Sequence, residues 1–255
     1  MKRLSLVLWL ALLPLPTQAA CRLSLAIALD VSGSVDATEY RLQMSGLAAA
    51  LKDPDVEAAL FAIPEAPVAL AIYEWSSSRY QRVVLDWTLV ENRDVLIRVQ
   101  TRLLGWQREK APEATGLGAA MEFGKAMLDR GPACWTKTLD ISGDGKNNDW
   151  PDPRLSRASG ALAGIRINGL VIARDTGSAG EKMVADAGEL SAYFLARVVQ
   201  GPDAFVEVAA GFEDYAVAMR RKLLRELKSQ PIGVLPKMSG DAFVPVSLHR
   251  SGEDQ

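Results

Sequence analysis

Short apolar runs alternate along the sequence with stretches in which apolar residues recur at helical spacing. Residues 23–29 and 68–75 form continuous apolar runs of the length expected for buried strands. Between them, Tyr40, Met44 and Leu47 recur every three or four positions, which predicts an amphipathic helix. Strands that alternate with helices in this way predict parallel βαβ units with helices on both faces of one sheet.

The same patterns give the remaining elements. Strands are predicted over residues 23–29, 68–75, 82–87, 136–142, 167–173 and 191–199, and helices over 36–51, 92–104, 116–128, 154–165, 181–187 and 212–227. The serines at 76–78 form a turn, so residues 82–87 return beside residues 68–75. We therefore expect an α/β fold: a doubly wound, mostly parallel six-stranded sheet with one antiparallel edge strand.

The first twenty residues have the pattern of a secretory signal peptide. Lys2 and Arg3 precede an apolar stretch over residues 4–15, and small residues precede a cleavage point near Ala19 or Ala20. The stretch is too short to cross a bilayer as a helix, so we expect no transmembrane span in the mature chain. We predict a signal peptide (1–20), one domain (21–228) and a flexible tail (229–255) that is rich in proline and glycine, in a periplasmic or secreted protein.

Charge and histidine content exclude several classes of function. The 255 residues carry 29 basic and 31 acidic side chains, a net charge of −2 that becomes −4 without Lys2 and Arg3, whereas nucleic-acid binders usually have a basic excess. The single histidine, His249, lies in the predicted tail. Catalytic sites that need an imidazole in a packed environment, and metal sites built from several histidines, are therefore not expected.

Three loops carry the candidate chemistry. Asp30, Ser32 and Ser34 follow the first predicted strand, Thr115 precedes a predicted helix, and Asp144 follows the strand over residues 136–142. Loops at the carboxyl ends of neighbouring parallel strands meet at one edge of an open sheet. Because carboxylates and hydroxyls are hard oxygen ligands, these five side chains suit Mg²⁺ or Mn²⁺ rather than zinc or copper.

Three motifs follow one another along the chain: a strand followed by Asp-x-Ser-x-Ser, a distant Thr-Gly that opens a helix, and a later strand followed by Asp-Gly. In this order they resemble the von Willebrand factor A domain and its metal-ion-dependent adhesion site. The resemblance covers about residues 23–227. More narrowly, the chain is similar to a group of uncharacterised secreted bacterial proteins with this fold. The resemblance implies that Ser32, Ser34 and Thr115 are hydroxyl ligands and that Asp30 and Asp144 bind the metal directly or through water.

The third loop departs from the family pattern by an inserted glycine, Gly143. We assign Asp144 to the site, with Asp140 as the alternative. We otherwise interpret Asp140 as a structural acid that accepts hydrogen bonds from nearby loop amides. Lys146, Asn147, Asn148 and Asp149 are either a rim that contacts a partner or a plain polar turn, and the basic residues 220–222 are expected on a solvated helix face.

The two cysteines, Cys21 and Cys134, allow two interpretations. Cys21 follows small residues, as the lipidated cysteine of a bacterial lipoprotein does, but Gln18 stands where that signal usually has Leu. The alternative is a disulfide, which an oxidising compartment allows. The family resemblance places both cysteines at the amino ends of adjacent strands and so favours a Cys21–Cys134 bond.

The leading functional hypothesis is a non-enzymatic, cation-dependent binding module in which an acidic residue of a protein partner completes the metal shell. The alternative is a Mg²⁺-dependent hydrolase similar to haloacid-dehalogenase phosphatases. Those enzymes need a second Asp two residues after the first, and here that position is Ser32. A third possibility is a structural domain with an empty metal site.

Overall fold

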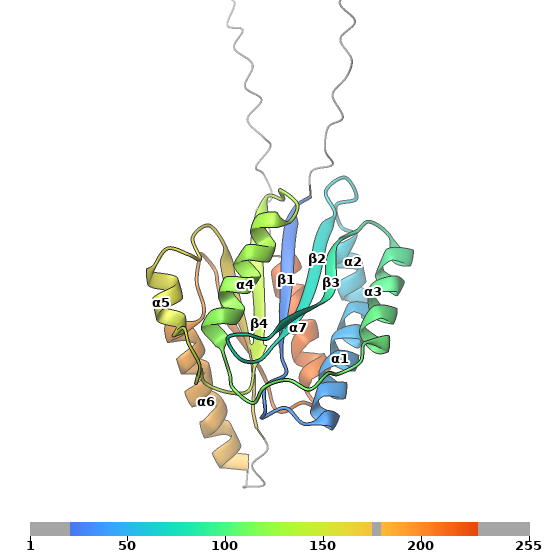
Figure 1. The fold of residues 1–255 in the computed structure, drawn as a ribbon. Coiled ribbons are helices and arrows are strands. Elements are labelled where there is room, and N and C mark those ends of the chain that lie inside the picture. The colour runs from blue at the N-terminus through green and yellow to red at the C-terminus, as the bar shows by residue number, and fades with distance from the viewer. Residues whose placement is uncertain (1–20, 175–179, 229–255) are drawn as a thin grey trace, which may run out of the picture.

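The computed structural model describes residues 21–174 and 180–228, which form one layered α/β unit around a six-stranded sheet (Figure 1). The strand order is β3-β2-β1-β4-β5-β6, and only the β2–β3 pair is antiparallel. This confirms the predicted fold class. The strands are β1 (Leu23–Asp30), β2 (Val68–Trp75), β3 (Gln81–Val90), β4 (Thr136–Gly143), β5 (Arg166–Ile172) and β6 (Val206–Ala209).

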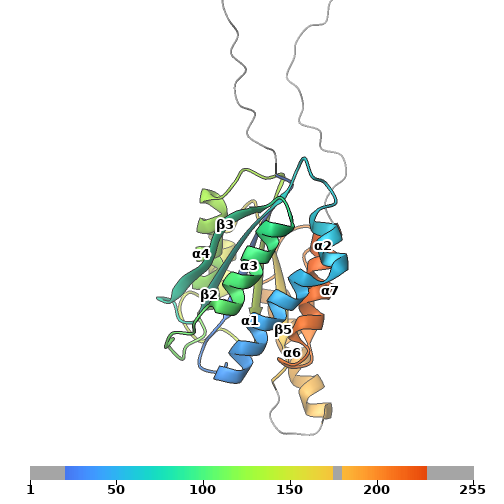
Figure 2. The ribbon, with the colours of Figure 1, turned by 90° about the vertical axis from the view of Figure 1, so that its right-hand side faces the viewer.

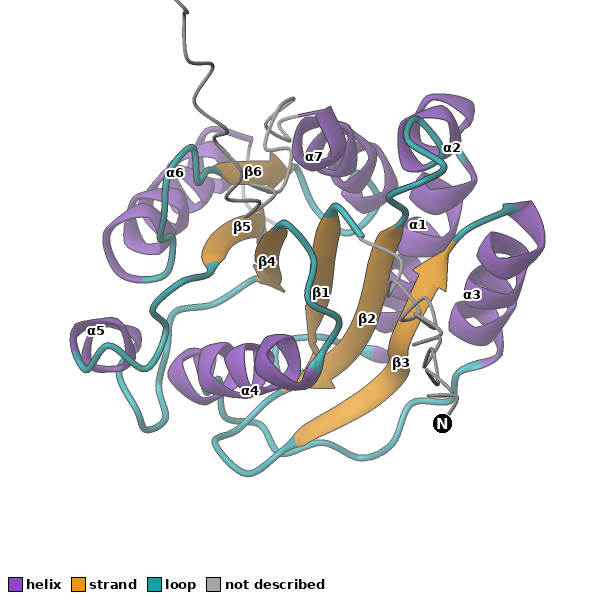
Figure 3. Cartoon of the chain, turned by 90° about the horizontal axis from the view of Figure 1, so that it is seen from above, coloured by secondary structure: helices purple, strands orange, loops and turns teal. Residues whose placement is uncertain are grey.

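Helices cover both faces of the sheet, as views turned by 90° about two axes show (Figures 2 and 3). One face carries α1 (Ala37–Lys52), α2 (Pro54–Leu60), α3 (Arg93–Gly105) and α7 (Tyr215–Lys228). The other carries α4 (Leu117–Arg130), α5 (Pro153–Ala158) and α6 (Gly180–Arg197).

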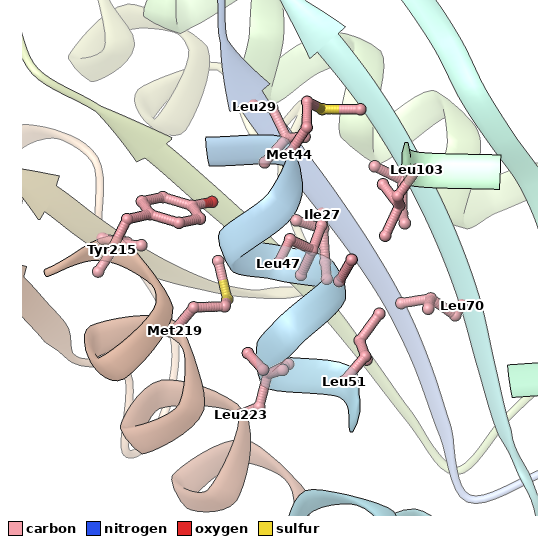
Figure 4. Packing of buried hydrophobic residues seen from close by; sticks show 14 of the residues in the cluster. Ile27, Leu29, Met44, Leu47, Leu51, Leu70, Leu103, Tyr215, Met219 and Leu223 are labelled. Atoms are coloured by element: carbon pink, nitrogen blue, oxygen red, sulfur yellow. The ribbon is translucent and has the colours of Figure 1, made fainter. Parts of the chain in front are cut away.

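Successive side chains of the central strands point to opposite faces of the sheet and belong to two separate hydrophobic cores. Ile27 and Leu29 of β1 pack with Leu47 of α1 and Met219 of α7 on one face (Figure 4). Ala28 of β1 belongs to the core on the other face, beneath α4 and α6. Burial on both faces explains why the central strands have continuous apolar sequences rather than an alternating pattern.

At the amino-terminal ends of the central strands, a disulfide and several hydrogen bonds hold neighbouring elements together. Cys21 and Cys134 form the expected disulfide, with Cα atoms 4.5 Å apart. Arg22 is buried beside it and donates hydrogen bonds to the carbonyls of Leu60 and Leu227, so the ends of α2 and α7 are fastened to the start of β1. The opposite, carboxyl-terminal edge is left to the loops that carry the candidate site.

In the second half of the chain, one predicted helix is shorter than expected and one predicted strand is wrong. The helix expected over residues 154–165 ends at Ala158, because Gly160 and Gly164 adopt positive φ angles of 76° and 77°. Most of residues 191–199, expected as the last strand, instead belongs to α6, which ends at Arg197, and Leu190, Phe194 and Val198 form a buried stripe at four-residue spacing. The sixth strand is the short β6.

A further helix, α2, was not expected. Asp53 ends α1 and its carboxylate then accepts hydrogen bonds from the amides of Asp55 and Val56, while Pro54 occupies the first turn. This is a standard helix start, so the Asp-Pro pair both stops one helix and begins the next.

The predicted signal peptide and the predicted tail lie outside the described residues. Within the described ranges, no helix has both the length and the apolar character needed to cross a bilayer.

Candidate metal site

The loop after β1 is held in a tight, closed conformation. The backbone amide of Ser32 donates to Asp30 Oδ1 (2.8 Å), which turns the chain back over the end of the strand. The amide of Val31 donates to the carbonyl of Trp75 on β2, and that of Gly33 donates to the carbonyl of Glu113. A Cβ on Gly33 would lie 2.8 Å from the Glu113 side chain, so glycine permits the close approach of the two loops.

The predicted hydroxyl ligands from two distant loops lie next to one another. Ser32 Oγ is 3.3 Å from Ser34 Oγ, and the Thr115 hydroxyl donates to Ser32 Oγ at 3.4 Å. The Ser34 hydroxyl also donates to Asp144 Oδ1 at 2.6 Å. The structure therefore brings all three loops to one point at the carboxyl edge of the sheet, as the sequence led us to expect.

Thr115 is positioned by backbone contacts on both sides. Its amide donates to Asn148 Oδ1 (2.7 Å), and its carbonyl accepts from the amide of Asn148 (3.0 Å). The amide of Gly116 donates to the carbonyl of Ser76 at 2.6 Å, and a Cβ at this glycine would lie 2.7 Å from the amide nitrogen of Ser78. Gly116 thus permits the close packing of the two loops, and Thr115 supplies the hydroxyl.

The inserted glycine of the third loop does not displace Asp144. Gly143 is the last residue of β4 and pairs with Val171 of β5, and Asp144 follows it directly at the site. A Cβ on Gly143 would lie 3.1 Å from Asp30 Oδ2. Glycine therefore leaves space beside the Asp30 carboxylate.

Both carboxylates are buried and have raised pKa values. Burial, and then the negative charge of Asp144, raise the pKa of Asp30 to about 7. Burial also raises the pKa of Asp144, and the Ser34 hydroxyl and the Arg174 guanidinium partly offset that effect. Two nearby buried carboxylates are costly to ionise together, so a cation between the loops would relieve the repulsion.

The donor set fits a hard dication. Asp30 Oδ2 and Asp144 Oδ2 are buried oxygens that accept no hydrogen bond. Over residues 21–174 and 180–228, no group of three or more His, Cys, Asp and Glu side chains is arranged to hold a metal. A metal here would depend on the hydroxyls of Ser32, Ser34 and Thr115, which suits Mg²⁺ or Mn²⁺ better than softer ions.

Asp140, the alternative ligand, lies away from this site. Its side chain is on the α7 face of β4, where Lys222 Nζ is 2.5 Å from Oδ1. It is a structural acid, as we interpreted it, but its partner is a lysine rather than loop amides. Lys222 is fully buried, so the expectation that residues 220–222 all lie on a solvated face is wrong for this residue.

The segment over residues 146–149 mostly braces the neighbouring loops. Asn148 holds Thr115, the Asn147 amide donates to the hydroxyl of Tyr193 (3.2 Å), and Asp149 Oδ2 accepts from the amide of Ser78 (2.8 Å). Lys146 is exposed and pairs with Glu189 on α6. Three of the four residues thus hold neighbouring loops in place, and contact of this segment with a partner stays a prediction.

Two charged residues near the site were missed by the sequence analysis. Arg174 Nε lies 3.8 Å from Asp144 Oδ2. Burial, and then the negative charges of Asp36 and Asp144, raise the pKa of Glu39, the second of these residues. Arg174 follows β5 at the carboxyl edge of the sheet, and the topology rule that selected Asp30 and Asp144 would have selected it too.

A protein-family model described as a protein of unknown function (DUF1194) matches residues 20–231. The chain belongs to the DUF1194 family. No curated protein matches its sequence.

Solved structures show how the DUF1194 fold relates to other proteins. Proximal thread matrix protein 1 from the mussel byssus has a TM-score of 0.55 and 9% identity over 82% of this chain and 49% of that one. The pilus adhesin SpaC from Lactobacillus rhamnosus GG has a TM-score of 0.54 and 13% identity over 83% of this chain and 31% of that one. The fold is von Willebrand factor A-like, and the chain spans about half or less of these structures.

Another structure of the mussel protein contains a zinc-occupied metal-ion-dependent adhesion site motif. Its TM-score is 0.53, with 11% identity over 82% of this chain and 46% of that one. At this identity the similarity establishes the fold alone, so the assignment of a metal to the DUF1194 chain depends on its own residues.

Proposed function

We propose that this protein is an exported, divalent-cation-dependent protein-binding module. Asp30, Ser32, Ser34, Thr115 and Asp144 would hold Mg²⁺ or Mn²⁺, and an acidic side chain of a protein partner would complete the shell. The observation that carries the proposal is the meeting of three separate loops, with two buried carboxylate oxygens that accept no hydrogen bond.

The chemistry of the site supports binding through a carboxylate. A dication held largely by neutral hydroxyls keeps strong Lewis acidity, and the bound ion would attract an anionic oxygen from outside. The chain's own contribution is to fix the hydroxyl cluster: the Asp30 turn orients Ser32, and Asn148 orients the Thr115 loop.

A non-enzymatic role agrees with the side chains present. In the phosphatase alternative, the position two residues after Asp30 must act as an acid and base, and Ser32 instead joins the hydroxyl cluster. The adhesin and the matrix protein of similar fold also favour binding over catalysis. Mg²⁺-dependent phosphatase turnover that is lost in Asp30→Asn would overturn this part of the proposal.

Export is proposed from the signal-like sequence and the disulfide. A Cys21–Cys134 bond persists in an oxidising compartment and is rare in the cytosol. The bond also makes lipidation of Cys21 the weaker alternative, because the same sulfur cannot serve both purposes.

Isothermal titration with Mg²⁺ and Mn²⁺ tests the metal site, with Asp30→Ala as the variant. We expect binding to the wild-type protein and none to the variant, while both keep the same circular dichroism spectrum. Capture of an envelope protein that is lost with EDTA and in Asp30→Ala would then support the binding role. Absence of any metal binding by the wild-type protein would refute the proposal.

A further inference from the structure

Arg174 ion-pairs with the very oxygen that the candidate site leaves for a metal. Its Nε is 3.8 Å from Asp144 Oδ2, the buried carboxylate oxygen that accepts no hydrogen bond. The Arg174 side chain is 56% exposed, whereas that of Asp144 is 1% exposed. A solvent-exposed cation thus partly offsets the charge of a buried carboxylate.

We propose that Arg174 is a built-in competitor of the metal, which balances the charge of Asp144 without a dication and withdraws when one binds. This inference depends on the proposed metal site. The N–O distance is beyond hydrogen-bond range, so the attraction is mainly electrostatic and costs little to break. A dication and a guanidinium beside the same carboxylate repel each other, so each weakens the binding of the other.

Other acidic side chains lie around Arg174 besides Asp144. Its charge acts on Glu39 as well as on Asp144, and Glu39 is held in place because its carboxylate accepts from the amide of Asp36. Arg174 also lines a groove of about 310 Å³ that includes Asp144, Lys146, Asp186 and Glu189. The guanidinium can therefore leave Asp144 and still face negative charge.

Lys146 provides a matched control within the same groove. It carries the same charge as Arg174 and lines the same groove, but its ammonium group pairs with Glu189 on α6 at 2.5 Å. Lys146→Gln removes one positive charge near the site without removing the ion pair to Asp144. A difference between the two variants thus separates direct competition from a general change in surface potential.

The test is titration of Mn²⁺ into wild-type protein, Arg174→Gln and Lys146→Gln at low and high ionic strength. We expect Arg174→Gln to bind Mn²⁺ about five- to tenfold more tightly at low salt, and Lys146→Gln to stay within about twofold of wild type. The gain in Arg174→Gln should shrink at 0.5 M salt, because screening weakens the competing ion pair.

The other outcomes refute either the competition by Arg174 or the metal site itself. Equal or weaker Mn²⁺ binding by Arg174→Gln, with the wild-type protein binding normally, refutes competition and leaves the metal site intact. An equal gain in Lys146→Gln also refutes direct competition. Failure of all three proteins to bind Mn²⁺ refutes the proposed metal site, and this inference with it.

Discussion

The side-chain nitrogen of Lys222 on α7 lies 2.5 Å from Oδ1 of Asp140 on β4, and both side chains are buried. Lys222 is also 2.6 Å from Glu226, and Asn168 of β5 donates to the same carboxylate at 2.9 Å. This cluster links the last helix to two central strands. The charges stabilise the fold only as a set, because each is buried away from water.

Lys222→Met should therefore destabilise the protein strongly. The variant leaves Asp140 and Glu226 facing each other without their shared cation, and breaking a buried ion pair from one side costs about 3 to 5 kcal/mol. Urea unfolding followed by circular dichroism measures the change. Arg221→Met is the control on the same helix: Arg221 pairs with Glu207 at the surface, and its loss should cost less than about 1 kcal/mol. Equal losses of unfolding free energy in the two variants would contradict the interpretation of Lys222 as the shared cation of a buried cluster.

Removing the disulfide should lower stability by a comparable amount. Cys21 and Cys134 are separated by 113 residues, and in the chain-entropy model a loop of this size is worth about 5 kcal/mol. We expect the variant with both cysteines changed to serine, and the reduced wild-type protein, to unfold at the same lower urea concentration. Two free thiols in the unreduced protein by mass spectrometry would show that the bond does not form.

The sequence predicted most of the sheet because its strands are buried on both faces. The expected strand over residues 68–75 has the same bounds as β2, and the expected order of strands and helices holds as far as β5 apart from the additional helix α2. The prediction failed where short-range patterns are ambiguous. Phe194 and Val198 lie in a segment rich in aromatic and β-branched residues, which favours a strand locally, but packing against the sheet makes it helical. The four-residue β6 is too short to give a pattern.

The candidate ligands could be located from sequence because chain order and topology place them. Asp30 and Asp144 follow adjacent parallel strands, and loops at that edge must meet. Arg174 was overlooked although the same rule applies to it, and the pairing of Lys222 with Asp140 could not be predicted because the two residues are distant in sequence. Lys222 follows two arginines, as surface residues do, although it is seven residues after the buried Tyr215 and so shares its helix face.

The metal-free protein should lose stability as the pH rises from about 4 to about 8. In the folded state the pKa of Asp30 is about 7, against an ordinary value of 3.8, so between these values the folded protein keeps a proton that the unfolded chain releases. Burial, and then the charge of Glu226, raise the pKa of Asp140 to about 7, which acts in the same direction. Chemical denaturation in EDTA should show the free energy of unfolding fall across this range, with each of the two carboxyls contributing up to about 4 kcal/mol.

Two comparisons identify the source of this pH dependence. Asp30→Asn should reduce the slope of the free energy of unfolding against pH, and the remaining slope should be the contribution of Asp140. Mg²⁺ added to the wild-type protein at pH 8 should restore stability, because the ion binds the ionised carboxylates of the folded state only. A metal-free protein whose stability does not change between pH 5 and pH 8 would contradict the raised pKa values.

Asn148 and Thr115 should act on metal affinity as one unit. Thr115→Val removes the hydroxyl but keeps the backbone bonds, and we expect roughly tenfold weaker Mn²⁺ binding. Asn148→Ala keeps the hydroxyl but releases the loop that carries it, so binding should also weaken several-fold although Asn148 supplies no ligand. In the double variant the losses should not add, because a displaced loop no longer presents the hydroxyl that the first change removes. Strict additivity, measured by titration calorimetry, would show that Asn148 acts on the metal by another route.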